Sequence, residues 1–159
     1  MRTKQDYITG LGKLRSNLYF KGEKIGRDHE DLIPSINVIA STFDAAQAPE
    51  TEALCTAVSH LTGDKISRFC HVHQSTDDLH KKQDMTRALC QKTGYCIGRC
   101  MGVDGLNAIN AVSYEADRAN KGQTHYHKNF LAWLEYFQKN DLVGSCAQTD
   151  VKGERLKRP

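Results

Sequence analysis

The chain has 159 residues, of which 39% are hydrophobic and 26% are charged, and its formal net charge is +3. This length suffices for one domain with a core, and the composition is that of an ordinary folded protein, which argues against disorder. The charge is small and no basic stripe alternates with aromatic residues, so we expect no nucleic-acid partner.

The amino-terminal sequence carries no targeting signal that we recognise. Its first ten residues, MRTKQDYITG, lack the apolar stretch of a signal peptide, and no apolar run approaches the roughly 20 residues that span a bilayer. We therefore expect no membrane partner and a cytoplasmic location. Thiols stay reduced in the cytoplasm, so the six cysteines indicate metal binding or catalysis before cross-links.

The first 25 residues predict a helix followed by a turn. Thr3 and Asp6 form a capping-box-like start, with apolar residues recurring at helical spacing behind it, which predicts a helix over 3–16. The aromatic run 17–25 is interrupted by Gly22 and therefore indicates a small hairpin or turn.

A second helix and a pair of short extended segments are predicted next. Pro34 suits the first turn of a helix that ends before Pro49. Its apolar stripe is most simply core and consists of Ile36, Ile39, Ala40, Phe43 and Ala46. After a brief helical turn, we expect residues 57–69 to form two extended segments joined by a tight turn at 62–64.

The second half of the chain is predicted to be mostly helical. Ser75 is an N-cap candidate for a helix from Thr76, with Leu79, Met85, Ala88 and Leu89 as its inward face. Glycines from Gly94 onward should bend or end this helix. Further expected elements are a helix over 104–120, a connection at 120–124, a helix over 125–139 and a closing strand at 142–148.

Three of the six cysteines lie in the stretch CQKTGYCIGRC, residues 90–100. On a helix, Cys96 and Cys100 are about 40° apart with Cβ atoms roughly 6 Å apart, so both sulfurs share one face. This geometry suits two corners of a metal cluster and makes a poor disulfide. Zinc would need two further ligands, for which His71/His73 and His125/His127 are the candidates. Two buried thiols are equally compatible with the spacing.

Glycines repeat every four residues around this pair, at Gly94, Gly98 and Gly102. In a helix they would leave one face without side chains, either for a bulky group or for close helix packing. The other cysteines share no spacing typical of a site and are predicted to be structural: Cys55, Cys70, Cys90 and Cys146.

Seven short motifs occur together along the chain, in this order: FKGEKI (20–25), PSIN (34–37), HQSTDDL (73–79), QKT (91–93), the Cys-x-x-x-Cys pair, YHKNF (126–130) and QTDVKGER (148–155). Together they resemble the amino-terminal part of the flavin-dependent 4-hydroxyphenylacetate 3-hydroxylase family, specifically its 4-hydroxybutyryl-CoA dehydratase branch. The resemblance covers essentially the whole chain but only about the first third of the family's usual length. It implies a mainly α fold, the amino-terminal helical domain of an acyl-CoA-dehydrogenase-like flavoprotein, with short extended segments. Residues 1–142 would form that domain and 143–159 would begin a β-rich middle domain.

The resemblance also implies site residues. Cys96 and Cys100 fall on two cysteines that ligate a [4Fe–4S] cluster, whose remaining Cys and His ligands lie in sequence absent here. The hydroxylase branch lacks this cysteine pair. Arg87 falls on a dehydratase arginine and is assigned a catalytic role, although a solvent-facing helix cation is its plain alternative. The flavin adenine dinucleotide (FAD) contacts would come from Gln148, Thr149, Asp150, Val151, Lys152, Gly153, Glu154 and Arg155.

Two departures from the family pattern concern these sites. The usual Asp-Pro-Lys-Gly-Asp-Arg reads DVKGER at 150–155, and Gly98 replaces a dehydratase glutamine. The implied reaction converts 4-hydroxybutyryl-CoA to crotonyl-CoA, with vinylacetyl-CoA isomerase activity, in a homotetramer. The resemblance implies a radical route in which flavin takes an electron from the substrate enolate and the cluster acts as a Lewis acid.

Two rival functions stay open at this point. In a flavin-dependent aromatic hydroxylase, Arg99 would meet a phenol or carboxylate and no iron would be bound. Alternatively, the chain is a non-enzymatic helical unit that binds a partner chain, with cysteines that have lost their role. Iron and acid-labile sulfide analysis separates the first rival from the dehydratase.

Overall fold

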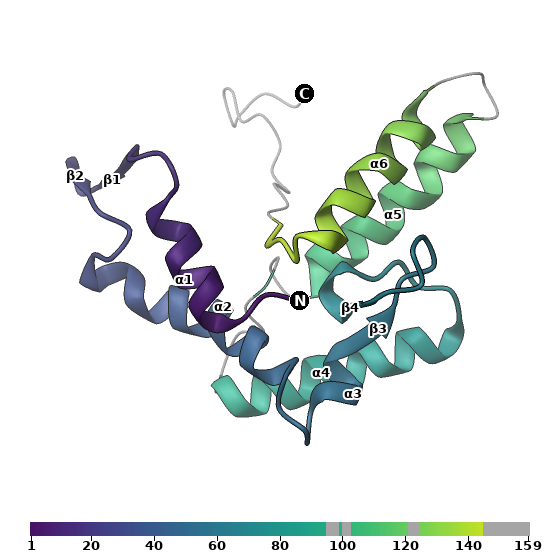
Figure 1. Ribbon diagram of the computed structural model, residues 1–159, viewed down its shortest axis with the longest axis horizontal. Helices are drawn as coiled ribbons and strands as arrows, with labels where there is room; N and C mark the ends of the chain where they lie inside the picture. Colours follow the sequence, from purple (N-terminus) through teal and green to yellow (C-terminus); the bar gives the residue numbers. More distant parts are fainter. Residues whose placement is uncertain (95–98, 100–102, 121–124, 145–159) are drawn as a thin grey trace, which may run out of the picture.

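The computed structural model describes residues 1–94, 99, 103–120 and 125–144, and it is mainly helical (Figure 1). The helices are α1 (Lys4–Gly12), α2 (Ile33–Ala45), α3 (Glu52–Cys55), α4 (Thr76–Thr93), α5 (Val103–Asn120) and α6 (Tyr126–Lys139). Two antiparallel hairpins pair β1 (Leu18–Phe20) with β2 (Glu23–Ile25) and β3 (Thr56–Val58) with β4 (Lys65–Ser67). Short 3-10 turns occupy Glu30–Leu32 and Arg68–Cys70. No helix in these ranges has the length and apolarity to cross a membrane.

The helices pack as two pairs joined by a third group. Figure 1 shows α1 beside α2 on one side, α5 beside α6 on the other, and α3 and α4 with the β3–β4 hairpin below them. Each group has its own core cluster: Tyr7, Ala40 and Phe43; then Ala45, Ala46, Cys55, Phe69, Met85 and Leu89; then Cys70, Val72, Ile109, Ala116, Phe130, Leu134 and Phe137.

The start of the chain confirms the predicted capping box. The Thr3 hydroxyl accepts from the Asp6 backbone N–H at 3.0 Å, and the Asp6 carboxylate accepts from the Thr3 N–H at 2.9 Å. The helix ends at Gly12 instead of residue 16, with Lys13 as its C-cap and Leu14 beyond it 53% exposed. The hairpin is confirmed, and its two-residue turn has positive φ at Lys21 (50°) and Gly22 (87°), as primed hairpin turns require.

The second helix and the second hairpin are confirmed as well. Ala40, Phe43 and Ala46 are buried, and Ile36 and Ile39 pack against the α1–α2 cluster from its edge. β3 and β4 are the two expected extended segments, and the turn at 62–64 lies between them. Gly63 in this turn has a positive φ of 76°.

The predicted inward face of α4 is confirmed at Met85 and Leu89, whereas Ala88 is only half-buried and the prediction for Leu79 is wrong. The Ser75 hydroxyl caps the helix by accepting from the Asp78 N–H at 3.3 Å, and Met85 and Leu89 are buried. Leu79 was expected inside but is 45% exposed. Six residues separate it from Met85, a rotation that places it about 120° away around the helix axis.

The glycine face predicted around the cysteine pair is wrong at Gly94. This residue is the C-cap of α4, with φ 77° and its N–H donating to the Cys90 carbonyl at 2.9 Å, so α4 does not continue to Cys96. Gly98, Gly102 and the 121–124 connection lie outside the described residues. The helices expected at 104–120 and 125–139 are confirmed by α5 and α6. Residues 142–144 of the expected closing strand are not in a strand, and 145–148 are not described.

Candidate functional site: a buried arginine beside the cysteine pair

Cys96 and Cys100, the predicted cluster ligands, lie outside the described residues, and Arg99 is the described residue nearest to them in the sequence. Its side chain is 1% exposed. Nε donates to the Thr42 hydroxyl at 2.9 Å, and Nη1 forms a buried ion pair with the carboxylate of Asp141. The guanidinium carbon lies 3.7 Å from the ring centroid of Phe43, a cation–π contact away from water.

Asp141 connects this arginine to the end of α6 and to the amino terminus. Its second carboxylate oxygen accepts from the backbone N–H of Arg2 at 3.0 Å. The backbone of Asp141 has a φ of 45°, a left-handed conformation that Asp and Asn adopt more readily than most residues. Arg99 therefore joins three parts of the chain that are remote in sequence.

These contacts bear on the hydroxylase reading. In that reading Arg99 would meet a phenol or a carboxylate of the substrate. In the structure its charge is already matched by Asp141 and its surface is buried, so Arg99 does not face a substrate. The substrate contact that the hydroxylase hypothesis assigned to Arg99 is therefore wrong for this buried, ion-paired side chain.

The cysteines within the described residues behave as structural residues. Cys55 and Cys70 are buried, and Cys90 packs against the cluster that contains Ala45 and Met85. Burial raises the pKa of the Cys55 thiol, which disfavours the thiolate form that binds metal. The prediction for these three cysteines is confirmed, whereas Cys146 lies outside the described residues.

A second buried cationic centre lies where α4 begins. Arg68 is 3% exposed and donates to two backbone carbonyls, from Nε to Leu54 at 2.7 Å and from Nη2 to Thr56 at 2.5 Å. Its Nη1 lies 3.5 Å from the carboxylate of Asp78. His71 Nε2 lies 3.2 Å from the same carboxylate.

The carboxyl of Asp78 has a shifted pKa because of these neighbours. Burial raises its pKa, but the N–H of Gln74 at 2.9 Å, the imidazole of His71 and the hydroxyl of Ser75 outweigh that effect and lower it to about 2. Within the described ranges no group of three His, Cys, Asp or Glu side chains is arranged to hold a metal ion. His71 lies beside the Asp78 carboxylate, and its ring centroid is 6.3 Å from that of His73.

Arg87 lies on the outer side of α4. Its side chain is 69% exposed, and Nη1 contacts the carboxylate of Asp84 at 3.2 Å within the same helix. The guanidinium is therefore accessible. Its assignment to substrate remains a proposal, because a solvent-facing ion pair of this kind forms without any ligand.

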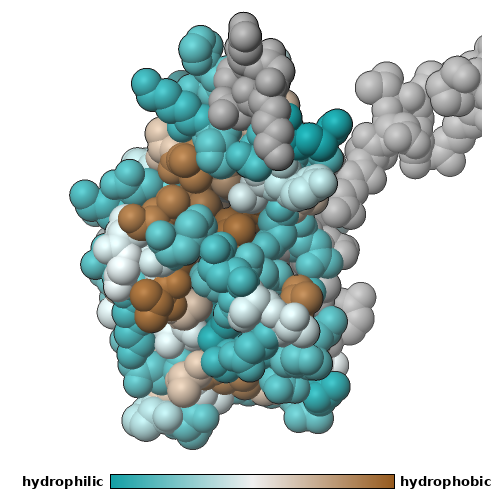
Figure 2. Space-filling model, turned by 90° about the vertical axis from the view of Figure 1, so that its right-hand side faces the viewer, coloured by the Kyte–Doolittle hydropathy of each residue, from teal (hydrophilic) through white to brown (hydrophobic). Residues whose placement is uncertain are grey.

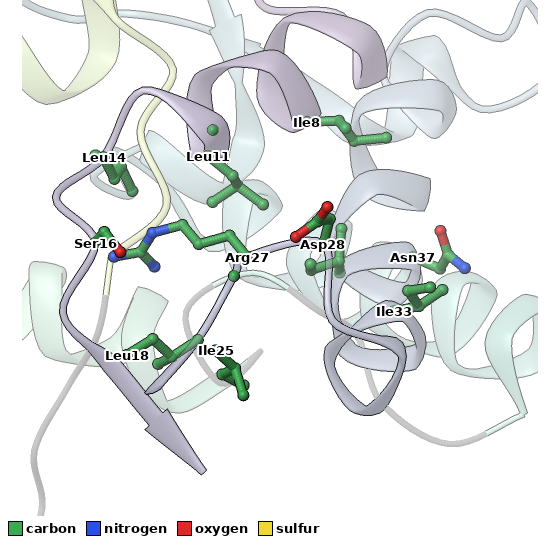
Figure 3. A pocket seen from close by; sticks show the side chains of 13 residues that line it. Ile8, Leu11, Leu14, Ser16, Leu18, Ile25, Arg27, Asp28, Ile33 and Asn37 are labelled. Carbon is green, nitrogen blue, oxygen red and sulfur yellow. The ribbon is translucent and has the colours of Figure 1, made fainter. Parts of the chain in front are cut away.

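A separate cavity of about 590 Å³ opens between α1, the β1–β2 hairpin and the start of α2 (Figure 3). Its walls are mostly apolar, with Arg27 reaching across it toward Ser16 in Figure 3 and donating to the Arg15 carbonyl at 3.1 Å. All lining residues fall between 8 and 37, so the cavity contains none of the predicted site residues. The predicted flavin contacts, 148–155, lie outside the described residues.

The face of the molecule that Figure 2 shows carries no single continuous apolar patch among its described residues. Figure 2 shows apolar side chains in separate patches between hydrophilic ones on the right-hand side of the molecule. Exposed large apolar residues such as Val58 and Val112 come from different elements, β3 and α5. This face does not by itself favour the partner-binding reading.

The donor chemistry around residue 99 fits an iron–sulfur group. Two thiolates four residues apart are soft donors of the kind such clusters use. Arg99 lies between the two cysteines in the sequence, and its Nη2 atom is buried without a hydrogen-bond partner. An anionic sulfur would satisfy such a donor, whereas an apolar surrounding would leave it unpaired.

Comparison with solved structures shows which class of proteins shares this fold. The fold is mainly α and matches the amino-terminal third of a solved oxygen-tolerant archaeal 4-hydroxybutyryl-CoA dehydratase from N. maritimus, with a TM-score of 0.88, 39% identity and coverage of 99% of this chain and 31% of that one. It also matches the oxygenase component HpaB of 4-hydroxyphenylacetate 3-monooxygenase, solved with FAD and 4-hydroxyphenylacetate, with a TM-score of 0.76, 24% identity and coverage of 100% and 32%. The HpaB likeness shows the fold alone.

The family follows from the sequence match. The family described as 4-hydroxyphenylacetate 3-hydroxylase N terminal matches residues 3–159, and this chain belongs to it. Over 157 residues the chain is 47% identical to the 4-hydroxybutyryl-CoA dehydratase/vinylacetyl-CoA-Δ-isomerase of Clostridium aminobutyricum, covering 98% of this chain and 32% of that enzyme. The chain thus spans about a third of the length of these relatives.

Proposed function

We propose that the protein acts as the amino-terminal part of an FAD- and [4Fe–4S]-dependent dehydratase that converts 4-hydroxybutyryl-CoA to crotonyl-CoA and isomerises vinylacetyl-CoA. The observation that carries this proposal is the 47% identity to the Clostridium enzyme across nearly the whole chain, against 24% for the HpaB hydroxylase component. We further propose an acyl-CoA substrate, a homotetramer and a cytoplasmic location, with the helical domain ending near residue 142.

Each predicted residue has a chemical role in this proposal. Cys96 and Cys100 supply two thiolates to the cluster, and residues 148–155 hold the ribityl and pyrophosphate oxygens of FAD. Arg87 is a cation that can bind the thioester oxygen or a CoA phosphate. When bound, the two cofactors supply one-electron chemistry and a Lewis-acidic iron for a β-proton that ordinary protein bases cannot remove.

The proposed dehydratase activity is tested by combining this chain with the rest of the enzyme and its cofactors. The chain is reconstituted anaerobically with a second chain that supplies the remaining two thirds of the relatives' length, together with FAD, iron and sulfide. We expect crotonyl-CoA from 4-hydroxybutyryl-CoA in the mixture and none from the 159-residue chain alone, because two cluster ligands and most of the flavin site are missing from it.

The same preparation discriminates between the dehydratase and the hydroxylase. The dehydratase proposal predicts iron and acid-labile sulfide in the reconstituted protein and no oxygen-dependent hydroxylation of 4-hydroxyphenylacetate. Hydroxylation by an iron-free protein with reduced flavin would instead establish the hydroxylase activity.

A further inference from the structure

The cavity between α1, the β1–β2 hairpin and the start of α2 has a lining that fits an aliphatic chain (Figure 3). Its volume of about 590 Å³ falls within the range of small-molecule sites in proteins. None of the described residues that line it is aromatic, and flat ring ligands are commonly held by stacking on aromatic side chains. The lining therefore favours a flexible aliphatic group over a flavin or a phenol. Most of its wall consists of seven aliphatic side chains: Ile8, Leu11, Leu14, Leu18, Ile25, Ile33 and Ile36.

Arg27 gives this cavity a half-buried cation without a counter-ion. Its guanidinium forms no ion pair with any carboxylate in the part of the chain that the structure describes. Nη2 donates to the Arg15 carbonyl at 3.1 Å and to the Asn17 side-chain oxygen at 3.4 Å, whereas Nε is buried and has no hydrogen-bond partner. A buried donor without an acceptor costs folding free energy, and an anionic ligand would supply the acceptor.

Asp28 is the other charged side chain of the lining, and its position leaves this preference for an anion in place. It is exposed to water. Figure 3 shows its carboxylate away from the guanidinium of Arg27, which reaches toward Ser16. Because water and salt screen an exposed charge, Asp28 repels an anion at Arg27 only weakly compared with the attraction of a direct charge pair.

We propose that this cavity binds a free medium-chain fatty acid, with its carboxylate paired to Arg27 and its alkyl chain against the aliphatic wall. A guanidinium and a carboxylate form charge-assisted hydrogen bonds, which account for the head group. Burial of the alkyl chain supplies the remaining affinity. All lining residues fall between 8 and 37, so the proposal goes beyond the dehydratase assignment and does not depend on it.

The test titrates the 159-residue chain with hexanoate, octanoate and decanoate below their micelle concentrations and follows the backbone amide shifts by NMR. Each added methylene should tighten binding about threefold to fourfold, which is the effect of burying one CH₂ group. The shifting amides should lie within residues 8–37. Octanol and octylammonium have the same alkyl chain without the negative charge, so they should bind at least about tenfold more weakly than octanoate.

Variants at two arginines separate a specific head-group contact from general attraction by charge. Arg27→Met should weaken octanoate binding about tenfold or more. Arg15→Met is the matched control, because it removes the same charge from an exposed residue that does not line the cavity, and it should leave the affinity nearly unchanged. Asp28→Asn should tighten binding. Circular dichroism checks the fold of each variant, and the ligand series with the unsubstituted chain decides the question if Arg27→Met does not fold.

Several outcomes would overturn the fatty-acid site. These are equal affinity for octanoate and octylammonium, equal weakening by Arg15→Met and Arg27→Met, or amide shifts outside residues 8–37. Loss of octanoate binding when the chain is combined with the rest of the enzyme would also overturn it, because the cavity would then be a docking surface for that part. Crotonyl-CoA formation in the same mixture reports on the dehydratase alone. Saturable octanoate binding in an inactive mixture would therefore leave the fatty-acid site standing.

Discussion

Arg68 and Arg99 are both buried, yet they bind different kinds of acceptor. Arg68 donates to the carbonyls of Leu54 and Thr56, which are 14 and 12 residues away, while Arg99 binds Thr42 and Asp141, which are 57 and 42 residues away. The first arginine therefore stabilises one local region, formed by α3, β3 and the start of α4. The second joins residue 99 to α2 and to Asp141, which follows the end of α6.

The largest expected effect is at Arg99. Arg99→Met leaves the Asp141 carboxylate buried with one backbone N–H, and removing one partner of a buried pair costs about 3–5 kcal/mol of folding free energy. Chemical denaturation measures this loss. Adding Asp141→Asn to Arg99→Met should recover part of it, because the remaining group is then neutral; a further additive loss would contradict the account.

Arg68→Met is expected to cost less, about 1–3 kcal/mol, because it leaves neutral carbonyls without donors. Asp78, its charged neighbour, is partly exposed and keeps its contacts with Gln74 and Ser75. The same denaturation measurement ranks the two variants. A loss at Arg68 equal to or above that at Arg99 would remove the distinction between the two centres.

Acid sensitivity should come from the Arg68 region. The pKa of Asp78 falls from 3.8 to about 2 on folding, so its contribution is complete above pH 3.8 and disappears as the pH drops through about 2. Allowing for its partial exposure, this contribution is about 1–2 kcal/mol. Denaturation between pH 5 and 2 should show a shallower pH slope in Asp78→Asn, and an unchanged slope would contradict the assignment.

The smallest effect is expected for an exposed ion pair. Arg118 contacts Glu115 at 2.7 Å on α5, with both side chains more than half exposed. Exposed pairs at this spacing contribute at most about 0.5 kcal/mol, so Glu115→Gln should leave the unfolding midpoint nearly unchanged. A loss of folding free energy comparable to that of Arg68→Met would show that the exposure of an ion pair does not determine its contribution to the stability of this chain.

The sequence predicted the local features of the fold better than its long-range contacts. Caps, hairpin turns and apolar periodicity are local signals, so the Thr3 and Ser75 caps, the Gly22 turn and the core face of α2 were predicted correctly. Leu79 was assigned to the buried face of α4 because it is apolar, without regard to its angular position around the helix axis relative to Met85. The prediction that the helix bends or ends from Gly94 onward is confirmed, because Gly94 is its C-cap, but the glycine repeat that assumed a continuous helix there was wrong.

The candidate site was only partly accessible to sequence reasoning. The Cys-x-x-x-Cys spacing pointed to a metal, and the family resemblance pointed to the flavin segment, but no local pattern pairs Arg99 with residues 42 or 57 positions away. The hydroxylase alternative therefore assigned Arg99 to a substrate contact, whereas its partners in the structure are the buried Thr42 and Asp141. A buried pair of this kind emerges only when the tertiary structure brings the helices together.

The most direct test of the account is the iron content of three cysteine variants after anaerobic reconstitution. Cys90 is partly buried and packs against the core cluster that contains Ala45 and Met85, so Cys90→Ala should keep the iron, acid-labile sulfide and visible absorption of the unsubstituted protein. Cys96→Ala and Cys100→Ala should each abolish them, because every cluster corner needs its ligand. Equal iron and sulfide in all four proteins would contradict the central claim that this pair of thiolates holds a cluster.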